Sequence, residues 1–472
     1  MDTRRLLSTT VLYGVADMVV LAVGGFLLIP LYTRTLSQAE FGTYVIFRAN
    51  TEIVTYLLFL GMPSAVARLY FEYHKKGEQH AYLSSVMMFF GLALLVFGAV
   101  LALWGAPLWA LLSPGVPADP YLGFSLAIAA TGFLGAIGTT WLRMEGRALA
   151  FAGVQVAASL VLAGVAVVNL LLLGRGLTGL LWAMLVSSAC AALVLPWLFG
   201  ARFRPLMRWA HIRASLHYAL PIVVGYAAYF VLNRINTVIL QRHVEVDQVA
   251  IFGLAQQLAM LVSIAAMAFG KAMQPAVFAA EPAAAAALML RIEKLFILLM
   301  SAITGALVLF SAQVFALMAP PSYAGGQGVL LVLLLASFAY SFTLISDTAL
   351  LYHQRPKTSV AITLAGAAVA AALGLLLIPA YQLYGAAGAI FGGFLTMALL
   401  SHQMARRVTG HAYLAPMALA LAALGALAAL VAWFDRQGWA TAPALAVKAA
   451  LLLALAGAAF GLYARQGGAR PA

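Results

Sequence analysis

Charge is scarce in this sequence: only 9% of its 472 residues are Asp, Glu, Lys or Arg, whereas 64% are hydrophobic. Soluble domains carry about a quarter charged residues, so a soluble fold of this composition would expose far too much apolar surface to water. In a lipid bilayer every backbone amide must find a partner inside the protein, which allows only helices or closed barrels. The scarcity of charge therefore excludes an ordinary soluble domain.

Cysteine and the motifs of common enzymes are also missing. A single cysteine, Cys190, excludes a disulfide framework or a cysteine metal site within one chain. No glycine-rich phosphate loop supports ATP hydrolysis, and the eight histidines form neither an HExxH motif nor a ligand cluster. We therefore expect no cofactor and no metal, and a transporter rather than an enzyme.

Long apolar runs are what the sequence does contain. Runs of about 20 residues suit helices that cross a bilayer, whereas barrel strands alternate apolar and polar residues over about ten positions. The predicted fold class is an all-α polytopic membrane protein. Fourteen membrane helices are predicted, near 9–31, 43–66, 82–112, 120–142, 149–173, 177–200, 216–240, 248–271, 293–318, 327–351, 358–379, 385–404, 413–433 and 443–464.

Basic residues are distributed unevenly between the predicted loops. Of the 27 Lys and Arg residues, twenty lie in one alternate set of segments and only four in the other, namely Arg34, Arg175, Arg242 and Arg436. Because cytoplasmic loops carry the excess of Lys and Arg, both termini are predicted to be cytoplasmic. The net charge of +13 thus mostly reflects membrane topology and the contact of basic loops with membrane lipids. No nucleic-acid partner is expected.

The two halves of the chain repeat. An offset of 208 residues aligns Arg5 with Arg213, Arg34 with Arg242, and Arg147 with Arg355, and Gly176 and Gly179 match Gly385 and Gly388 one residue further along. Both halves start on the same side, so a pseudo-twofold axis along the membrane normal is predicted. The predicted domains are a six-helix bundle at 1–200, a cytoplasmic linker at 201–215, a second six-helix bundle at 216–405, and two additional helices with a tail at 406–472.

A few charged residues fall inside predicted helices. Burying a charge at membrane depth costs about 2.5–3.5 kcal/mol on insertion scales, so such residues usually face a bundle interior or a water-filled cavity. Asp17, Arg48, Glu52 and Arg234 are the candidates. Polar residues recur on one face of the first two helices of each half, and Gln256 aligns with Arg48 at the 208 offset. We expect these helices to line a shared central cavity.

Other interpretations of these residues stay open. Arg48 and Glu52 are four residues apart on one helix and could neutralise each other as a structural pair. Asp17 is a candidate for ion coupling, with Na⁺ or H⁺ as the ion, or a structural hydrogen-bonding residue between helices. Arg234 has no acidic residue within a helical turn, which favours a ligand or a distant partner.

The stretch Pro30-Leu-Tyr-Thr-Arg-Thr-Leu-Ser-Gln-Ala-Glu-Phe-Gly-Thr-Tyr44 resembles the loop after helix one in polysaccharide-biosynthesis flippases of the Wzx type, members of the MOP superfamily. The Gly61-Met-Pro-Ser-Ala-Val-Ala-Arg68 segment is similar to the same family, and length and topology agree over residues 1–405. The Gly/Asp/Arg loop signature of major-facilitator proteins is absent from 68–79.

The resemblance implies a flippase that moves an undecaprenyl-diphosphate-linked oligosaccharide across the bacterial inner membrane by alternating access. It also implies a cationic cavity holding the diphosphate and sugars, a task that suits the permanent charge of arginine. The implied substrate-binding residues are Arg48, Arg234, Glu52, Asn233 and Gln256, with Arg34 and Arg242 at the outer mouth. Polysaccharide polymerase or export machinery is a candidate partner.

Three alternative functions are open at this point. A MurJ-type lipid II flippase and a MATE-type cation-coupled drug exporter belong to the same superfamily. The sequence has fewer buried arginines than we expect of a lipid II flippase, which counts against the first of these. Fourteen predicted helices, rather than the twelve usual in MATE proteins, count against the second. A membrane glycan polymerase or ligase is the alternative outside transport, but such enzymes generally carry a large outward loop, and no predicted outward loop exceeds about a dozen residues.

Reporter fusions test the predicted topology. Fusions at Gly77, Phe203, Gly410 and the C-terminus should report the cytoplasm, because these segments belong to the basic set of loops. Fusions at Pro117, Asp247 and Tyr323 should report the outside. An alkaline phosphatase signal at any of the first group, or its absence at any of the second, would contradict the fourteen-helix map.

Overall fold

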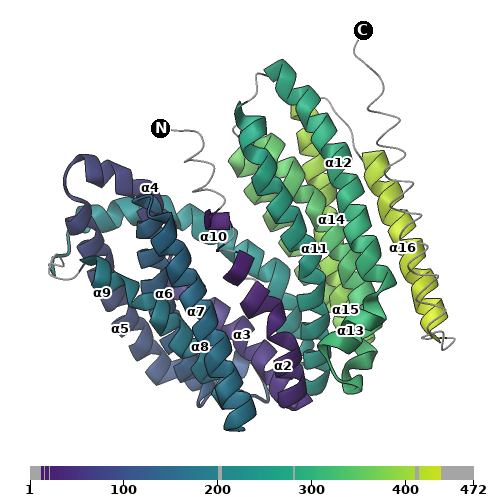
Figure 1. Ribbon diagram of the computed structural model, residues 1–472, viewed down its shortest axis with the longest axis horizontal. Helices are drawn as coiled ribbons and strands as arrows, with labels where there is room; N and C mark the ends of the chain where they lie inside the picture. The colour runs from purple at the N-terminus through teal and green to yellow at the C-terminus, as the bar shows by residue number, and fades with distance from the viewer. Residues whose placement is uncertain are drawn as a thin grey trace. The chain divides into compact units, whose positions relative to one another are not determined.

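The computed structural model describes residues 12–14, 16, 18–20, 22–199, 205–279, 282–353, 355–409 and 414–436, and these contain helices and no strand (Figure 1). The helices are η1 (Val23–Leu27), α2 (Ile29–Thr35), α3 (Gln38–Phe59), α4 (Met62–Lys75), α5 (Gln79–Leu112), α6 (Tyr121–Met144), α7 (Ala148–Val167), η2 (Val168–Leu172), α8 (Gly176–Ala192), α9 (Val194–Phe199), α10 (Trp209–Leu240), α11 (Val246–Ala279), α12 (Pro282–Leu309), α13 (Ser311–Met318), η4 (Pro321–Gly326), α14 (Gln327–Tyr352), α15 (Pro356–Thr409) and α16 (Leu414–Arg436). Eleven helical stretches in this described part are long and apolar enough to cross a membrane. The predicted all-α membrane fold is confirmed.

Several predicted boundaries are wrong. The first helix was expected to end at residue 31, but the chain continues through the π-helical η1 into α2, which ends at Thr35. The second was expected at 43–66; instead α3 ends at Phe59, and Leu60 and Gly61 take left-handed φ values of 46° and 69° before α4 begins. Glycine meets this backbone conformation without the penalty of a Cβ atom. The last predicted helix, 443–464, lies outside the described residues.

Helix α15 contains two membrane crossings. A straight helix of its 54 residues would be about 80 Å long, more than twice the hydrocarbon thickness. Gln382, with φ 49° and ψ −120°, interrupts the helix. A Cβ on Gly366 would meet Met397, and a Cβ on Gly392 would meet Leu373, so the two parts pack side by side in opposite directions. The separate predicted helices 358–379 and 385–404 are therefore both present, as a tight hairpin.

The chain divides into two compact units, Met1–Phe230 with Val244–Ala250, and Val231–His243 with Ile251–Ala472. In the first unit Tyr82, Phe133 and Trp141 are fully or almost fully buried in the core, and the rings of Phe90 and Phe133 stack with centroids 3.7 Å apart. In the second unit α14 packs along α15, and α12 packs on α14 and α16. The division runs through α10 and α11 rather than between whole helices.

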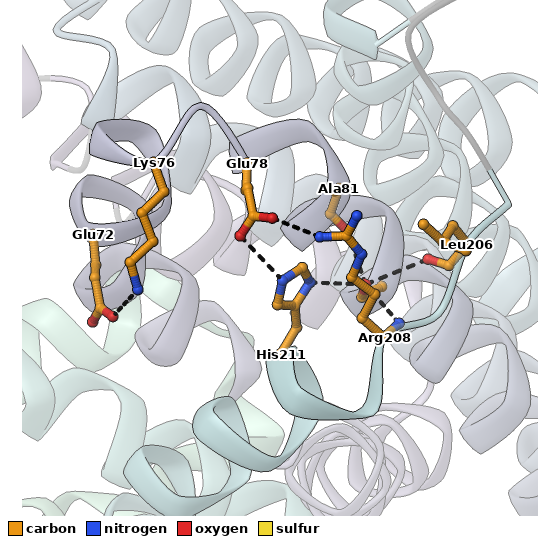
Figure 2. A network of polar contacts seen from close by, with 8 residues as sticks. Glu72, Lys76, Glu78, Ala81, Leu206, Arg208 and His211 are labelled. Atoms are coloured by element: carbon orange, nitrogen blue, oxygen red, sulfur yellow. Dashed lines mark hydrogen bonds and ion pairs between the residues drawn. The ribbon is translucent and has the colours of Figure 1, made fainter.

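The predicted linker at 201–215 is partly helical, because α10 begins at Trp209. The start of α10 is fixed to the turn between α4 and α5 by a polar network (Figure 2). The Arg208 guanidinium donates to the Glu78 carboxylate at 2.6 Å, and the Arg208 backbone amide donates to the Ser85 hydroxyl at 3.1 Å. Residues 208–215 therefore belong to the first unit.

His211 is the buried centre of this network, with 4% of its surface exposed. Its Nδ1 lies 3.1 Å from the Ser85 hydroxyl, and its ring packs edge-on against Tyr73 and Tyr82. The Tyr82 hydroxyl in turn lies 3.0 Å from that of Ser215. At the surface, a hydrogen bond from Lys76 to Glu72 raises the pKa of Lys76 (Figure 2). Since exposed ion pairs contribute little, the buried His211 contacts anchor this segment.

Candidate functional site

The segment 30–44 is mostly helical rather than the expected loop: it comprises most of α2, a short turn at Leu36 and Ser37, and the start of α3. Ser37 is the N-cap of α3 and accepts a hydrogen bond from the backbone N–H of Glu40, while the Glu40 carboxylate accepts from the Ser37 N–H at 2.9 Å. This reciprocal capping box satisfies two of the N–H groups that a helix start leaves without partners. Glu40 also accepts from the Leu177 N–H at 3.2 Å, so one carboxylate caps both α3 and the start of α8.

Two glycines allow close packing at this turn. A Cβ on Gly42 would lie 2.1 Å from the backbone oxygen of Val246, and one on Gly176 would lie 2.4 Å from Oε1 of Glu40. Gly176 also has a φ of 54°, which favours glycine. The sequence Ser-x-x-Glu indicates the capping box, but the contacts with Leu177 and Val246 join segments far apart in the chain and have no local signal.

Helix α3 presents the predicted charged pair. Arg48 is half-buried, and its guanidinium carbon lies 5.9 Å from the centre of the Tyr44 ring. The Glu52 carboxylate lies close enough to interact electrostatically with this guanidinium. The Tyr56 hydroxyl donates to Glu52 at 2.9 Å. Arg48 therefore has an aromatic and an acidic neighbour on its own helix, so the structural pairing expected as an alternative remains compatible with a binding role.

Buried polar contacts anchor α3 within the first unit. Asn50 donates to the Ser113 hydroxyl at 2.6 Å, and the hydroxyls of Thr51 and Ser125 lie 2.8 Å apart. All four side chains are buried. Polar contacts of this kind hold membrane helices together, because lipid offers polar groups no alternative partner. They fix the rotation of α3 and hence the direction in which Arg48 and Glu52 project.

In the second unit, the end of α10 and the start of α11 meet through a predicted site residue. The Gln256 side-chain amide donates to the backbone oxygen of Asn233 at 2.8 Å. Asn233, Arg234, Gln256 and Gln257 are half-buried. Neighbouring Asn236 is fully buried, and its amide atoms have no hydrogen-bond partner among the described residues. The structure thus brings Gln256 into contact with the backbone of Asn233.

The two arginines predicted at the outer mouth are both exposed. Arg34 lies in the last turn of α2, and Arg242 lies just after α10. They occupy equivalent positions in the two halves of the sequence, each at the end of the first helix. Asp17 lies outside the described residues. Within the described part of the chain, no group of three or more His, Cys, Asp or Glu residues could hold a metal ion.

One pair of glycines aligned by the sequence repeat makes comparable contacts in the two units. A Cβ on Gly179 would meet the side chain of Asn169, and a Cβ on Gly388 would contact Leu377. Asn169 and Leu377 are 208 residues apart, and the two glycines are 209 apart, the offsets found in the sequence. The sixth helix of each half therefore begins against the end of the fifth through a glycine at the same place.

Known structures share this fold. The chain matches "Lipid II flippase MurJ, inward closed conformation" with a TM-score of 0.74 and 12% identity, over 97% of this chain and 99% of that one. It also matches an inward-facing multidrug resistance MATE family transporter of the MOP superfamily (TM-score 0.63, 18% identity, 84% and 94% covered). A third match is the Vibrio cholerae MATE transporter VcmN in the bent form (TM-score 0.56, 15% identity, 90% and 98% covered). The chain is thus a multi-pass membrane protein with the fold of MOP-superfamily transporters.

Sequence comparison specifies the family within this fold class. The sequence profile described as "Polysaccharide biosynthesis protein" matches residues 10–280, more than half of the chain. The chain belongs to the polysaccharide biosynthesis protein family, as the resemblance at residues 30–44 and 61–68 predicted. No curated protein matches the chain in sequence.

Gly42→Ala tests the close contact at the α3 start. The new methyl group would overlap the Val246 carbonyl, which is backbone and cannot rotate away, so we expect a loss of about 1–3 kcal/mol in stability. Gly123→Ala is the matched control, since nothing lies within 4 Å of a Cβ there. The higher helix propensity of alanine should raise the stability of this variant by up to about 1 kcal/mol. Thermal unfolding of the purified protein in detergent measures both, and equal midpoints would contradict the prediction.

Proposed function

We propose that this protein is a flippase for an undecaprenyl-diphosphate-linked oligosaccharide, a repeat unit of O-antigen, capsule or exopolysaccharide. The observation that carries the proposal is family membership together with half-buried arginines in helices long and apolar enough to cross a membrane. A diphosphate headgroup cannot cross hydrocarbon unaided, because burying an unpaired anion costs many kcal/mol. A hydrated cavity with fixed cations supplies partners to the headgroup while the polyprenyl tail stays in lipid.

Arginine is suited to this role for two reasons. Its charge is permanent, and its planar fork of N–H donors matches the oxygens of a phosphate. In the proposed mechanism Arg48 and Arg234 bind the diphosphate, and Glu52 keeps Arg48 oriented through the pairing on α3. Asn233 and Gln256 offer neutral hydrogen bonds, and Arg34 and Arg242 attract the headgroup at the outer mouth.

The likeness to MATE transporters supports alternating access as the mode of transport, in which the cavity opens to one side of the membrane at a time. In the proposed setting, the protein lies in the inner membrane with both termini in the cytoplasm. The substrate is loaded from the cytoplasmic face and passed to polysaccharide polymerase or export machinery on the other side. Na⁺ or H⁺ drives the cycle.

Alanine substitutions test the cationic site. Arg48→Ala and Arg234→Ala should each weaken substrate binding by about 1.5–3 kcal/mol, or roughly 10–150-fold, because each removes a hydrogen-bonded charge. Cells carrying either variant should accumulate the lipid-linked precursor on the cytoplasmic face and export less glycan. Lysine at either position should restore part of the activity, since the charge survives and the fork does not.

Arg407→Ala is the matched control, because Arg407 is exposed at the end of α15, and export should be unchanged. Full-rate glycan export by well-expressed Arg48→Ala and Arg234→Ala variants would refute the cationic mechanism. Transport of hydrophobic cations by the purified protein, with no movement of lipid diphosphates, would replace the flippase with a drug exporter.

Asp17→Asn tests ion coupling. A carboxylate that binds the coupling ion loses its charge in this variant while its size stays the same, so transport in proteoliposomes should no longer respond to an imposed Na⁺ or H⁺ gradient. Substrate binding without a gradient should be preserved. A gradient response equal to that of the wild type would return Asp17 to a structural role.

A further inference from the structure

An open cavity lies between α6, α7 and α8 of the first unit, and its mostly apolar lining includes four polar side chains, Thr139, Gln155, Ser187 and Ser188. Its volume, including the space at its open mouth, is about 860 Å³. Each helix contributes one face: Gly132, Gly135, Ala136 and Thr139 of α6 follow the helical repeat, as do the lining residues of α7 and α8. The small residues on these faces leave the space between helices unfilled. This cavity is built from residues of one bundle and none of the predicted site residues lines it.

Hydroxyl groups in and beside this cavity already donate their hydrogens to other groups of the protein. Thr139 donates to the Gly135 carbonyl at 2.8 Å, and Ser187 donates to the Ala158 carbonyl at 2.7 Å. Ser188 lies 2.9 Å from the Leu185 carbonyl and 2.6 Å from the hydroxyl of Thr131. Each hydroxyl oxygen keeps a lone pair that can accept a further hydrogen bond. These hydroxyls therefore act mainly as acceptors toward anything that enters.

Gln155 of α7 supplies the other polar function. Its side chain is half-buried at the cavity wall and makes no hydrogen bond with any described residue. A side-chain amide offers two N–H donors and one acceptor oxygen. In a bundle surrounded by lipid, an amide without a protein partner needs water or a ligand, because its desolvation costs free energy. The Gln155 amide can therefore donate to and accept from a polar ligand in this cavity.

This chemistry discriminates between the parts of a lipid-linked glycan. No charged residue lines the cavity among the described residues, and an array of acceptors would repel the oxygens of a diphosphate. A polyprenyl chain would leave the hydroxyls and the amide without hydrogen bonds. A neutral sugar, in contrast, carries many O–H donors and several acceptors, and its flat faces can lie against small residues such as Gly132 and Ala158.

We propose that the cavity between α6, α7 and α8 binds an uncharged sugar unit of the transported glycan, separately from the arginines that bind the diphosphate. The inference rests on the proposed function and names a second binding site for the same substrate. In this proposal, the positive charge of the arginines recognises the diphosphate headgroup, and the hydroxyl acceptors of the cavity recognise the glycan.

Cysteine labelling tests this assignment, and the chain makes it simple because Cys190→Ala alone removes all cysteine. In this background, Ser187→Cys places a thiol at the cavity wall. N-ethylmaleimide reacts with thiols in contact with water, so Ser187→Cys should be labelled at a rate close to that of Lys76→Cys in an exposed turn. Leu160→Cys, on an exposed apolar face of α7, should react slowly in proteoliposomes because that face meets lipid.

Three lipids then compete with the label: the lipid-linked oligosaccharide extracted from the native host, undecaprenyl diphosphate without sugars, and undecaprenol. We expect only the sugar-bearing lipid to slow labelling of Ser187→Cys, by tenfold or more. Gln155→Leu and Thr139→Val should each weaken its binding about fivefold to tenfold, the cost of one lost hydrogen bond or amide. Thr363→Val, which loses a similar intrahelical bond on α15, is the matched control and should bind normally.

The outcomes separate the two proposals. Three outcomes would each overturn the sugar site alone. These are equal protection by the sugar-free lipids, an unreactive Ser187→Cys thiol, and no protection while the oligosaccharide lipid binds and is transported. Failure of the protein to bind or move the oligosaccharide lipid would overturn the proposed function, and the sugar site with it. Protection by that lipid together with normal transport by both Arg48→Ala and Arg234→Ala would leave the sugar site standing and refute the cationic mechanism.

Discussion

The absence of water in the hydrocarbon core is the constraint on which this structure depends. Each backbone N–H and C=O must be satisfied within the protein, which makes helices the rule and restricts the places where a helix can break. The breaks at Gly61 and Gln382 lie where the chain packs on itself: a Cβ on Gly61 would touch α10, and the two parts of α15 lie against each other. The break at Gly61 is thus buried in protein contacts, whereas Gln382 is exposed at the tip of the α15 hairpin.

Close contact between helices follows from the same constraint. Lipid tails are as apolar as leucine, so helices associate through small residues and polar contacts rather than through a hydrophobic driving force. Gly42 lets α3 approach Val246, and Gly135 and Gly138 let α6 approach α8 and α9. The buried bonds of Asn50 and Thr51 then fix the rotation of α3. These contacts determine which side chains face the lipid and which face polar interiors.

Polar residues serve two different purposes in this setting. Those of the His211 network and the Glu40 turn are consumed in holding segments together, and their partners are all within the first unit. Arg48 and Gln155 instead lie half-buried, Arg48 beside other polar residues of α3 and Gln155 on the largely apolar helix α7. A cost of about 2.5–3.5 kcal/mol for a charge at membrane depth makes such placements informative about ligands. The proposed division between a charged and a neutral site follows from this contrast.

Much of the fold could be predicted because the length and hydropathy of an apolar run are local properties of the sequence. The runs that form α5, α6 and α14 are recognisable by their length and hydropathy. The break at Leu60 and Gly61, the continuation of the first helix to Thr35, and the helical start at Trp209 could not be predicted, because each depends on a partner segment. His211 is one example: its sequence neighbours reveal nothing of Ser85 or Tyr73.

The sequence by itself determined that the protein is helical, lies in a membrane, repeats at an offset of 208 residues and belongs to a polysaccharide biosynthesis family. It also indicated Arg48, because a charge in an apolar run is visible without coordinates. Only the tertiary structure decided that Glu40 caps two helices and that Gln155 shares a cavity with Thr139 and Ser187. The physical reason is that hydrophobicity is a property of each residue, whereas a cavity is a property of the distances between helices.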